Sequence, residues 1–329
     1  MSRLWTGFRS VFADGIQAFL AYKRALGRQY RAEESALRLF DRFLVQHRIA
    51  TAADVTPATI DDFLVSRPRP APRSYNHLHG TLVRFFDWMI RQERLLDSPV
   101  RSKPRRGTRV RLPFLLDPAA ARRLFDVAGR LPDNNFTTCR GSSFRTIFTL
   151  LYGLGLRVGE VERLRVGDID ATRRVLHIRD TKFAKSRFVP YGPRIDTLLT
   201  AHLARRAQQQ QLLSAEMPVF AQRSGRPIRA DTISLTFHRL VPQLGLVVPD
   251  GAIGPRVHDL RHAFATRTLL RWYRNGLDPR SRLLSLATFL GHVNPASTAV
   301  YLTMTPELLS HASERFRTWA KPVLEEVPR

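Results

Sequence analysis

The fold and the chemistry of this chain are indicated by His258-Asp259-Leu260-Arg261-His262, followed by Leu290-Gly291-His292 and then by Tyr301. Upstream, the stretch Gly153-Leu154-Gly155-Leu156-Arg157 ends in a second arginine, and Glu160 follows it. Guanidinium groups bind phosphodiester oxygens bidentately and stay charged at any working pH. Imidazoles can move the proton of a tyrosine, which is too weak an acid to ionise unaided. These residue types therefore suit attack on a phosphodiester by a phenolic oxygen without a metal ion.

This ordered set resembles the tyrosine recombinase family, also called the phage integrase family, and the resemblance runs from about residue 12 to about residue 320. The nine-residue step from His292 to Tyr301, with Leu-Gly before the histidine, is similar to the family's. The resemblance implies a mainly α fold with a small antiparallel β-sheet. An N-terminal helical, SAM-like core-binding domain would precede an α+β catalytic domain. It also implies a site-specific DNA recombinase or integrase, serving integration, excision or transposition of a mobile element.

The resemblance assigns each matched residue a role. Arg157 and Arg261 would bind the scissile phosphate, and Glu160 would orient Arg157. His258 would accept or return the tyrosine proton, and His292 would donate a hydrogen bond to the phosphate. Tyr301 would be the nucleophile, leaving a 3′-phosphotyrosyl link. His262 is expected to bond locally within the site.

A lysine should protonate the departing 5′ oxygen, and the basic turn between two expected strands, Val175–Ile178 and 188–190, offers two candidates. Lys182 matches the family's position relative to Arg157. The family shows a glycine on either side of this lysine, whereas this chain has threonine and phenylalanine there. Lys185 therefore stays an alternative to Lys182.

The charge of the chain indicates a polyanionic partner. Lys plus Arg number 53 against 28 Asp plus Glu, a formal net charge of +25. Such an excess favours a nucleic acid as the partner, and a ribosome-associated or membrane-surface protein is the alternative that charge alone leaves open. The family resemblance implies that this nucleic acid is double-stranded DNA. The single cysteine, Cys139, excludes an intramolecular disulfide and a cysteine-based zinc cluster. With neither a signal peptide nor a membrane-length apolar run, a cytoplasmic, nucleoid-associated bacterial protein is expected, without cofactor or metal.

The hydrophobic pattern predicts three parts. Residues 1–100 show apolar stripes at helical spacing, with a cap at Thr56-Pro57, and are interpreted as the core-binding domain. Residues 113–329 are interpreted as the catalytic domain, with a helix starting at Asp117-Pro118. Residues 101–112 between them are interpreted as a linker that lies along the phosphate backbone, a solvated hinge being the alternative. Its six basic residues are Arg101, Lys103, Arg105, Arg106, Arg109 and Arg111.

Two further segments carry expectations about assembly. Residues 272–280 make the step from Arg261 to His292 longer than the family norm, and they are interpreted as a loop insertion. Residues 306–319 show helical spacing, which indicates either a helix on its own domain or one that docks into a neighbouring protomer. The resemblance implies four protomers on two DNA sites, with accessory or sister recombinases as further partners.

Other functions are weighed against this one. A type IB topoisomerase uses similar chemistry, but the N-terminal helical region argues against it. A catalytically silent DNA-binding regulator would not need every catalytic position filled. A metal-dependent nuclease is disfavoured because no compact carboxylate cluster accompanies the arginines. Zinc at His258 and His262 is disfavoured because Asp259 stands where zinc proteases need a glutamate.

Overall fold

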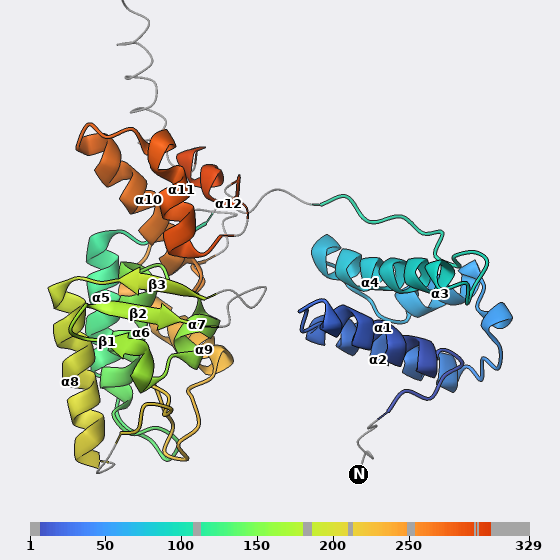
Figure 1. The fold of residues 1–329 in the computed structure, drawn as a ribbon, viewed down its shortest axis with the longest axis horizontal. Helices are drawn as coiled ribbons and strands as arrows, with labels where there is room; N and C mark the ends of the chain where they lie inside the picture. Colours follow the sequence, from blue (N-terminus) through green and yellow to red (C-terminus); the bar gives the residue numbers. More distant parts are fainter. Residues whose placement is uncertain are drawn as a thin grey trace, which may run out of the picture. The chain divides into compact units, whose positions relative to one another are not determined.

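The computed structural model describes residues 7–107, 113–179, 186–209, 213–248, 254–292, 294 and 296–303. The chain divides into two compact units, Met1–Arg111 and Leu112–Arg329. Helices dominate both, and the second unit also carries a small antiparallel sheet (Figure 1). The predicted fold class is confirmed. No helix among the described residues is long and apolar enough to cross a membrane.

The N-terminal unit is a helical bundle with an aromatic core. Its helices are α1 (Ala13–Ala25), α2 (Arg31–Gln46), η1 (Ala52–Asp54), α3 (Pro57–Val65) and α4 (Pro72–Arg91). Phenylalanine rings fill its centre, and those of Phe12 and Phe86 meet edge to face at 5.4 Å. Thr56 caps α3 as predicted, because its hydroxyl accepts a hydrogen bond from Thr59 N. Buried rings from α1 to α4 therefore hold this unit together.

The basic run that follows α4 is attached to that helix as far as Gly107. The side chain of Asn76 exchanges two hydrogen bonds of 2.8 Å with the backbone of Arg105. The ring of His79 binds Ser102 O at 2.8 Å, and the guanidinium of Arg105 lies 4.0 Å from the ring centre of Tyr75. Polar bonds to the backbone, rather than apolar burial, thus fix residues that the sequence indicated only as a linker. Arg109 and Arg111 lie outside the described residues.

The C-terminal unit is built around helices α5 and α6 and the sheet. Its elements are α5 (Pro118–Gly129), α6 (Arg140–Gly153), α7 (Val158–Arg163), η2 (Val166–Asp168), β1 (Ile169–Asp170), β2 (Val175–Ile178), β3 (Arg187–Pro190), α8 (Pro193–Gln209), α9 (Ala230–Leu240), η3 (Val241–Leu244), α10 (Asp259–Arg274), α11 (Pro279–Leu290), α12 (Ala296–Ala299) and η4 (Val300–Thr303). Asp117 caps α5 as predicted, accepting from Ala120 N at 2.7 Å.

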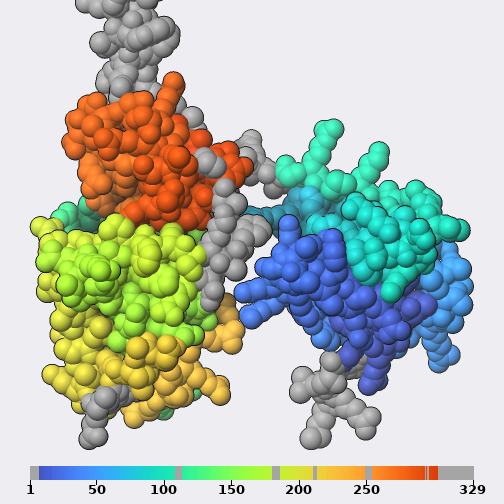
Figure 2. All heavy atoms as spheres, viewed as in Figure 1, coloured from blue at the N-terminus to red at the C-terminus, as the bar shows by residue number. Residues whose placement is uncertain are grey.

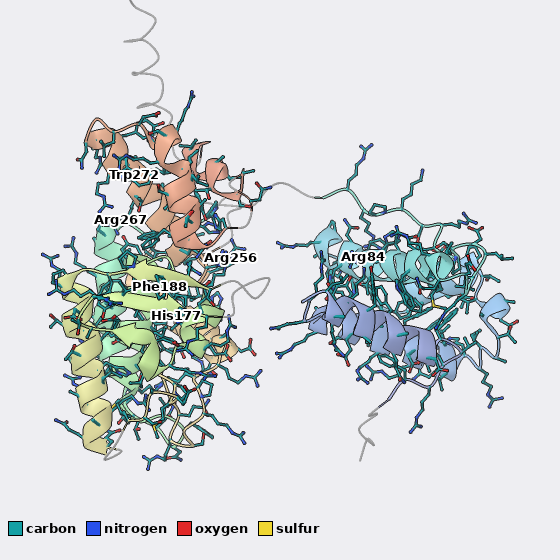
Figure 3. All side chains as sticks on the ribbon, in the orientation of Figure 1. Arg84, His177, Phe188, Arg256, Arg267 and Trp272 are labelled. Carbon is teal, nitrogen blue, oxygen red and sulfur yellow. The ribbon has the colours of Figure 1, made fainter. Side chains whose placement is uncertain are left out.

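The sheet has the order β1-β2-β3, all antiparallel. The pairing of β2 with β3 confirms the two predicted strands, whereas β1 was not predicted, because two residues are too short to show an alternating pattern. Leu176 and Val189 pair across β2 and β3 and face the core. On the other face the rings of His177 and Phe188 stack at 4.9 Å (Figure 3).

Helices α10, α11 and α12 gather at one end of this unit, next to β3 (Figure 1), and form a continuous mass there (Figure 2). Helix α10 runs to Arg274 and α11 begins at Pro279. The predicted loop insertion at 272–280 is therefore wrong for most of its length, and residues 275–278 make the connection. Trp272 and Tyr273 pack against the apolar cluster of α10 and α11, which extends the helix beyond the expected end.

A buried histidine joins α6, α8 and the segment around Val219. His202 is 0% exposed, and its Nε2 lies 3.0 Å from Val219 O and its Nδ1 3.1 Å from Ser142 Oγ. A neutral ring satisfies both contacts, since Nε2–H can donate to the carbonyl while Nδ1 accepts from the hydroxyl. Burial lowers the pKa of His202 to about 4, and the charge of Arg206 acts in the same direction.

We expect the C-terminal unit to lose stability in mild acid. The unfolded His202 takes up a proton near pH 6.5 and the folded one only near 4, so stability is complete above 6.5 and falls as the pH drops towards 4, by on the order of 3 kcal/mol. The free energy of urea unfolding, measured from pH 7.5 to 4, tests this. His202→Asn should be less stable at pH 7.5 yet vary less with pH. An unchanged slope in the variant would contradict the assignment.

Candidate active site

The carboxyl end of α11 is the anchor point of the site. The last carbonyls of a helix have no partner within the helix, and they carry the negative end of its dipole. Here three successive carbonyls each accept from a different arginine: Phe289 O from Arg187 Nε at 2.8 Å, Leu290 O from Arg261 Nη2 at 2.7 Å, and Gly291 O from Arg157 Nη2 at 2.8 Å. One helix end therefore fixes three guanidinium groups that come from α10, β3 and the start of α7.

Glu160 connects two of these arginines. Its Oε1 lies 2.8 Å from Nη1 of both Arg157 and Arg187, and its Oε2 accepts from Arg187 Nη2 at 2.9 Å. Oε2 also accepts from Arg157 N at 2.9 Å, which caps the first turn of α7 and explains the three-residue spacing. Burial alone would raise the pKa of Glu160, but the hydrogen bonds and charges of Arg187 and Arg157 outweigh it and hold that pKa at about 2.

Two glycines let the backbone reach the arginines. Gly155 has φ +61°, and a Cβ there would lie 2.6 Å from the ring of Phe264. Its carbonyl accepts from Arg261 Nη1 at 2.5 Å. Gly291 has φ +68°, and a Cβ there would lie 2.8 Å from Arg187 Nη1. Both positions require glycine by conformation and by space, which accounts for Gly-Leu-Arg at 155–157 and Leu-Gly-His at 290–292.

Arg261 and Tyr301 are buried side by side with these groups. Arg261 is 1% exposed and Tyr301 3%. Burial and the charge of Arg157 lower the pKa of Arg261 to about 9, which leaves the guanidinium charged at neutral pH. Burial raises the pKa of Tyr301, while the charges of Arg261 and Arg157 oppose that rise. The hydroxyl is therefore protonated at neutral pH and lies in an electropositive environment.

Two histidines contact the tyrosine, and a third contacts one of these two. His262 Nδ1 lies 2.9 Å from Tyr301 Oη. His258, one turn earlier at the start of α10, meets the ring of His262 edge to face at 4.8 Å. The ring of His292 stacks on that of Tyr301 at 6.4 Å, and its Nδ1 lies 2.7 Å from Thr298 Oγ1. Desolvation, aided by neighbouring positive charges, lowers the pKa of His258 and of His292 to about 4, so both rings are neutral near pH 7.

The structure thus brings together most of the residues singled out in the sequence. These are Arg157, Glu160, His258, Arg261, His292 and Tyr301. Lys182 and Lys185 lie outside the described residues. The basic residues Arg101, Lys103, Arg105 and Arg106 belong to the N-terminal unit. In the described ranges, no group of three or more His, Cys, Asp or Glu side chains could hold a metal ion.

The sequence did not single out two contributors: Arg187 binds Glu160, and Thr298 binds His292. His262, expected to bond locally within the site, does so through the hydroxyl of Tyr301. Arg187 stands at the start of β3, 27 residues after Glu160, a separation that carries no local signal. The spacing did indicate that His262 would lie near the site, because it stands one turn after His258 on the same helix.

Comparisons with known proteins show to which family the chain belongs. Residues 116–307 match the model of the Phage integrase family. The chain belongs to this family, the tyrosine recombinases. It is 35% identical over 318 residues to the putative integrase/recombinase y4rB of Sinorhizobium fredii, covering 94% of this chain and 98% of that protein. It is 30% identical to tyrosine recombinase XerC 2 of Ralstonia nicotianae, over 85% of this chain and 77% of the relative.

Solved structures show the same fold. The Tn1549 transposon integrase, in complex with a circular intermediate DNA, aligns with a TM-score of 0.65 at 17% identity, over 93% of this chain and 100% of that one. Family membership makes this recombinase an enzyme that breaks and rejoins DNA strands at specific sites.

We expect Arg187 to contribute more to stability than an exposed arginine in an ion pair. Its side chain is 9% exposed, so Arg187→Met would leave the buried Glu160 with Arg157 as its remaining guanidinium partner. The free energy of unfolding should fall by about 3 kcal/mol. The matched control is Arg165→Met, since Arg165 pairs with Glu216 at the surface, where the loss should be at most about 1 kcal/mol. Equal losses in the two variants would contradict a structural role for the buried pair.

Proposed function

We propose that this recombinase cleaves DNA with Tyr301 as the nucleophile and Arg157 and Arg261 as the phosphate-binding groups. The observation that carries the proposal is the placement of the Tyr301 hydroxyl in the same cluster as two arginines held by the end of α11. Each guanidinium has five N–H donors, so donors remain on both beyond the bonds to the protein. An oxyanion with increasing negative charge is the species that such fixed, desolvated donors stabilise.

In the proposed reaction the phenolic oxygen attacks the scissile phosphorus, and the bond to the 5′ oxygen breaks. The product is a 3′-phosphotyrosyl ester and a free 5′-hydroxyl. The ester keeps the bond energy, so the 5′-hydroxyl of a partner strand can displace the tyrosine without ATP. Lys182, or Lys185 in its place, would protonate the leaving 5′ oxygen. His292 and His258, neutral near pH 7, would donate hydrogen bonds or exchange protons at the phosphate.

The burial of Arg261 and Tyr301 limits the access of a phosphate to the site. Arg261 and Tyr301 are almost without exposed surface in the free protein. A phosphate can therefore reach Arg261 only if the groups that cover its guanidinium move when DNA binds. Such a step fits an enzyme that must not cleave before it is assembled on its target.

Double-stranded DNA is the proposed partner. The net charge of +25 supports this, and the Tn1549 integrase of the same fold was solved with DNA. Besides Arg101, Lys103, Arg105 and Arg106, the N-terminal unit carries a second basic group. Partial burial lowers the pKa of Lys23, and so do the charges of nearby Arg28, Arg84 and Arg91 (Figure 3 labels Arg84). We further propose action as a tetramer on two sites, on a mobile element, at the bacterial nucleoid.

The first test is the covalent intermediate. Nicked suicide duplexes from DNA that flanks the gene are incubated with protein in chelator, and a denaturation-resistant adduct is sought. The wild type should form it and Tyr301→Phe should not, while binding of the duplex stays nearly unchanged. Tyr273→Phe is the matched control, because Tyr273 packs at the end of α10 in the same unit. An adduct with Tyr301→Phe would exclude Tyr301 as the nucleophile.

A second test addresses the basic run after α4, residues 101–107, called the basic segment below. Replacing Lys103 and Arg106 by Gln should weaken DNA binding and reduce the slope of log Kd against log salt by about 0.9 for each phosphate that the segment no longer neutralises. Arg205→Gln, an exposed position on α8, changes the charge elsewhere and serves as the control. If Arg205→Gln, which removes one charge, has half the effect of the variant that removes two charges from the segment, the segment makes no specific contact with the DNA backbone.

A further inference from the structure

The hydroxyl of Tyr301 has a defined hydrogen-bond partner in the described part of the chain. His262 Nδ1 lies 2.9 Å from Tyr301 Oη, and the two ring centres are 5.5 Å apart. His292 is stacked on the same tyrosine, but its Nδ1 is bound to Thr298. His258 meets the ring of His262 edge to face. Of these imidazoles, His262 is the one in hydrogen-bond contact with the oxygen that attacks phosphorus.

The protonation states of the pair suit a proton transfer. Burial raises the pKa of Tyr301, so its hydroxyl keeps its proton at neutral pH. Burial lowers the pKa of His262, so its ring is neutral there. A neutral imidazole that carries its proton on Nε2 presents a lone pair at Nδ1. In that tautomer the 2.9 Å contact runs from the Tyr301 hydroxyl as donor to His262 Nδ1 as acceptor, which is the arrangement that a general base requires.

We propose that His262 accepts the proton of Tyr301 during strand cleavage and returns it during rejoining, an inference that rests on Tyr301 being the nucleophile. As Oη bonds to phosphorus and the bond to the 5′ oxygen breaks, the proton passes from Oη to Nδ1. The 5′ oxygen takes a proton from a separate acid. In rejoining, the 5′-hydroxyl returns its proton to that acid as it attacks, and Oη recovers its own from His262. The proton transfer with the tyrosine, which was expected of His258 from the sequence, is thus assigned to His262.

The charges around His262 set the pH range in which it can act. The groups that face it are Arg256, His258, Asp259 and Arg261 from α10 and the residues before it, and Tyr301 from η4. Asp259 favours the protonated ring, whereas desolvation and the two arginines disfavour it. Asp259 is also held by Arg256, through Nη2 at 3.1 Å and the backbone N–H at 2.8 Å. The net effect is a pKa below the usual 6.5 of histidine, so the His262 ring stays neutral, and can act as a base, at a lower pH than a free imidazole.

The test compares pH profiles of single-turnover adduct formation on the suicide duplex. His262→Asn places an amide near the position of Nδ1, so a hydrogen bond can form but no proton can be taken up. At pH 7 its rate should be about 10²–10⁴-fold below wild type. The wild-type rate should fall in acid as His262 becomes protonated. The variant should lose this acid limb, and its rate should rise roughly tenfold per pH unit as hydroxide replaces the base.

Two controls separate this role from structural damage. His258→Asn changes the preceding turn of the same helix and should keep the acid limb even where its rate is lower. His238→Asn, at an exposed position on α9, should match wild type throughout. The proposal is overturned if His262→Asn keeps the acid limb at a rate within about twofold of wild type. It is equally overturned if His258→Asn, rather than His262→Asn, loses that limb.

A measurement without DNA tests the contact itself. In nitrogen-15 histidine spectra of the full chain, Tyr301→Phe should raise the pKa of His262, because the hydroxyl that the variant lacks stabilises the neutral ring by donating to Nδ1. An unchanged His262 titration would overturn the proposal even if cleavage occurs. Conversely, absence of any adduct with the wild type would count against Tyr301 as the nucleophile, whereas the contact between the two side chains would still be judged by these spectra.

Discussion

The end of one helix determines where the reactive groups of this protein lie. Helix α11 stops at Gly291, and the carbonyls of residues 289–291 each bind a guanidinium group. An arginine side chain is long and flexible, and holding three of them at one place costs rotamer entropy. Buried hydrogen bonds to charged donors offset that cost. The fold therefore fixes the positions of the three guanidinium groups before any phosphate arrives.

The same helix end connects the arginines to the nucleophile. His292 follows Gly291 directly, and Tyr301 lies on η4 shortly after it. Tyr301 packs against buried residues of α10 and α11, including Leu286 and Leu290. A shift of α11 would thus move the phosphate-binding groups and the tyrosine together. Catalysis by proximity and orientation requires a defined distance and angle between the nucleophile and the phosphate. A shared anchor keeps the tyrosine and the phosphate-binding groups in that relation.

The sequence predicted the elements whose signals are local. Thr56-Pro57 and Asp117-Pro118 mark helix starts through side chains that cap them, and glycine at 291 marks the end of α11. The order of Arg157, Arg261, His292 and Tyr301 was visible through family resemblance. What could not be predicted were contacts between distant segments, such as Arg187 with Glu160 and with Phe289 O.

The contacts of the basic segment could not be predicted from the sequence either. A run of arginines and lysines without apolar residues indicates a linker, since it cannot form a core. Its attachment to α4 depends on Asn76 and His79, which bind backbone groups of Arg105 and Ser102. Such bonds need no particular side chain on the segment, so the sequence of the segment carries no sign of them.

Burial, together with the charge balance of the site, keeps its histidines neutral, and the charge balance determines which ligand the site is suited to bind. Arg157, Arg187 and Arg261 contribute three positive charges, and Glu160 contributes one negative charge, which leaves an excess of two among largely buried groups. Protonating a histidine there would add to this excess, and the lowered pKa of His292 reflects burial together with the charges of Arg261 and Arg157. A phosphodiester entering the cluster brings one negative charge, and attack by tyrosine raises the charge on its oxygens. The electrostatic stabilisation is therefore greatest in the transition state, where it accelerates the reaction.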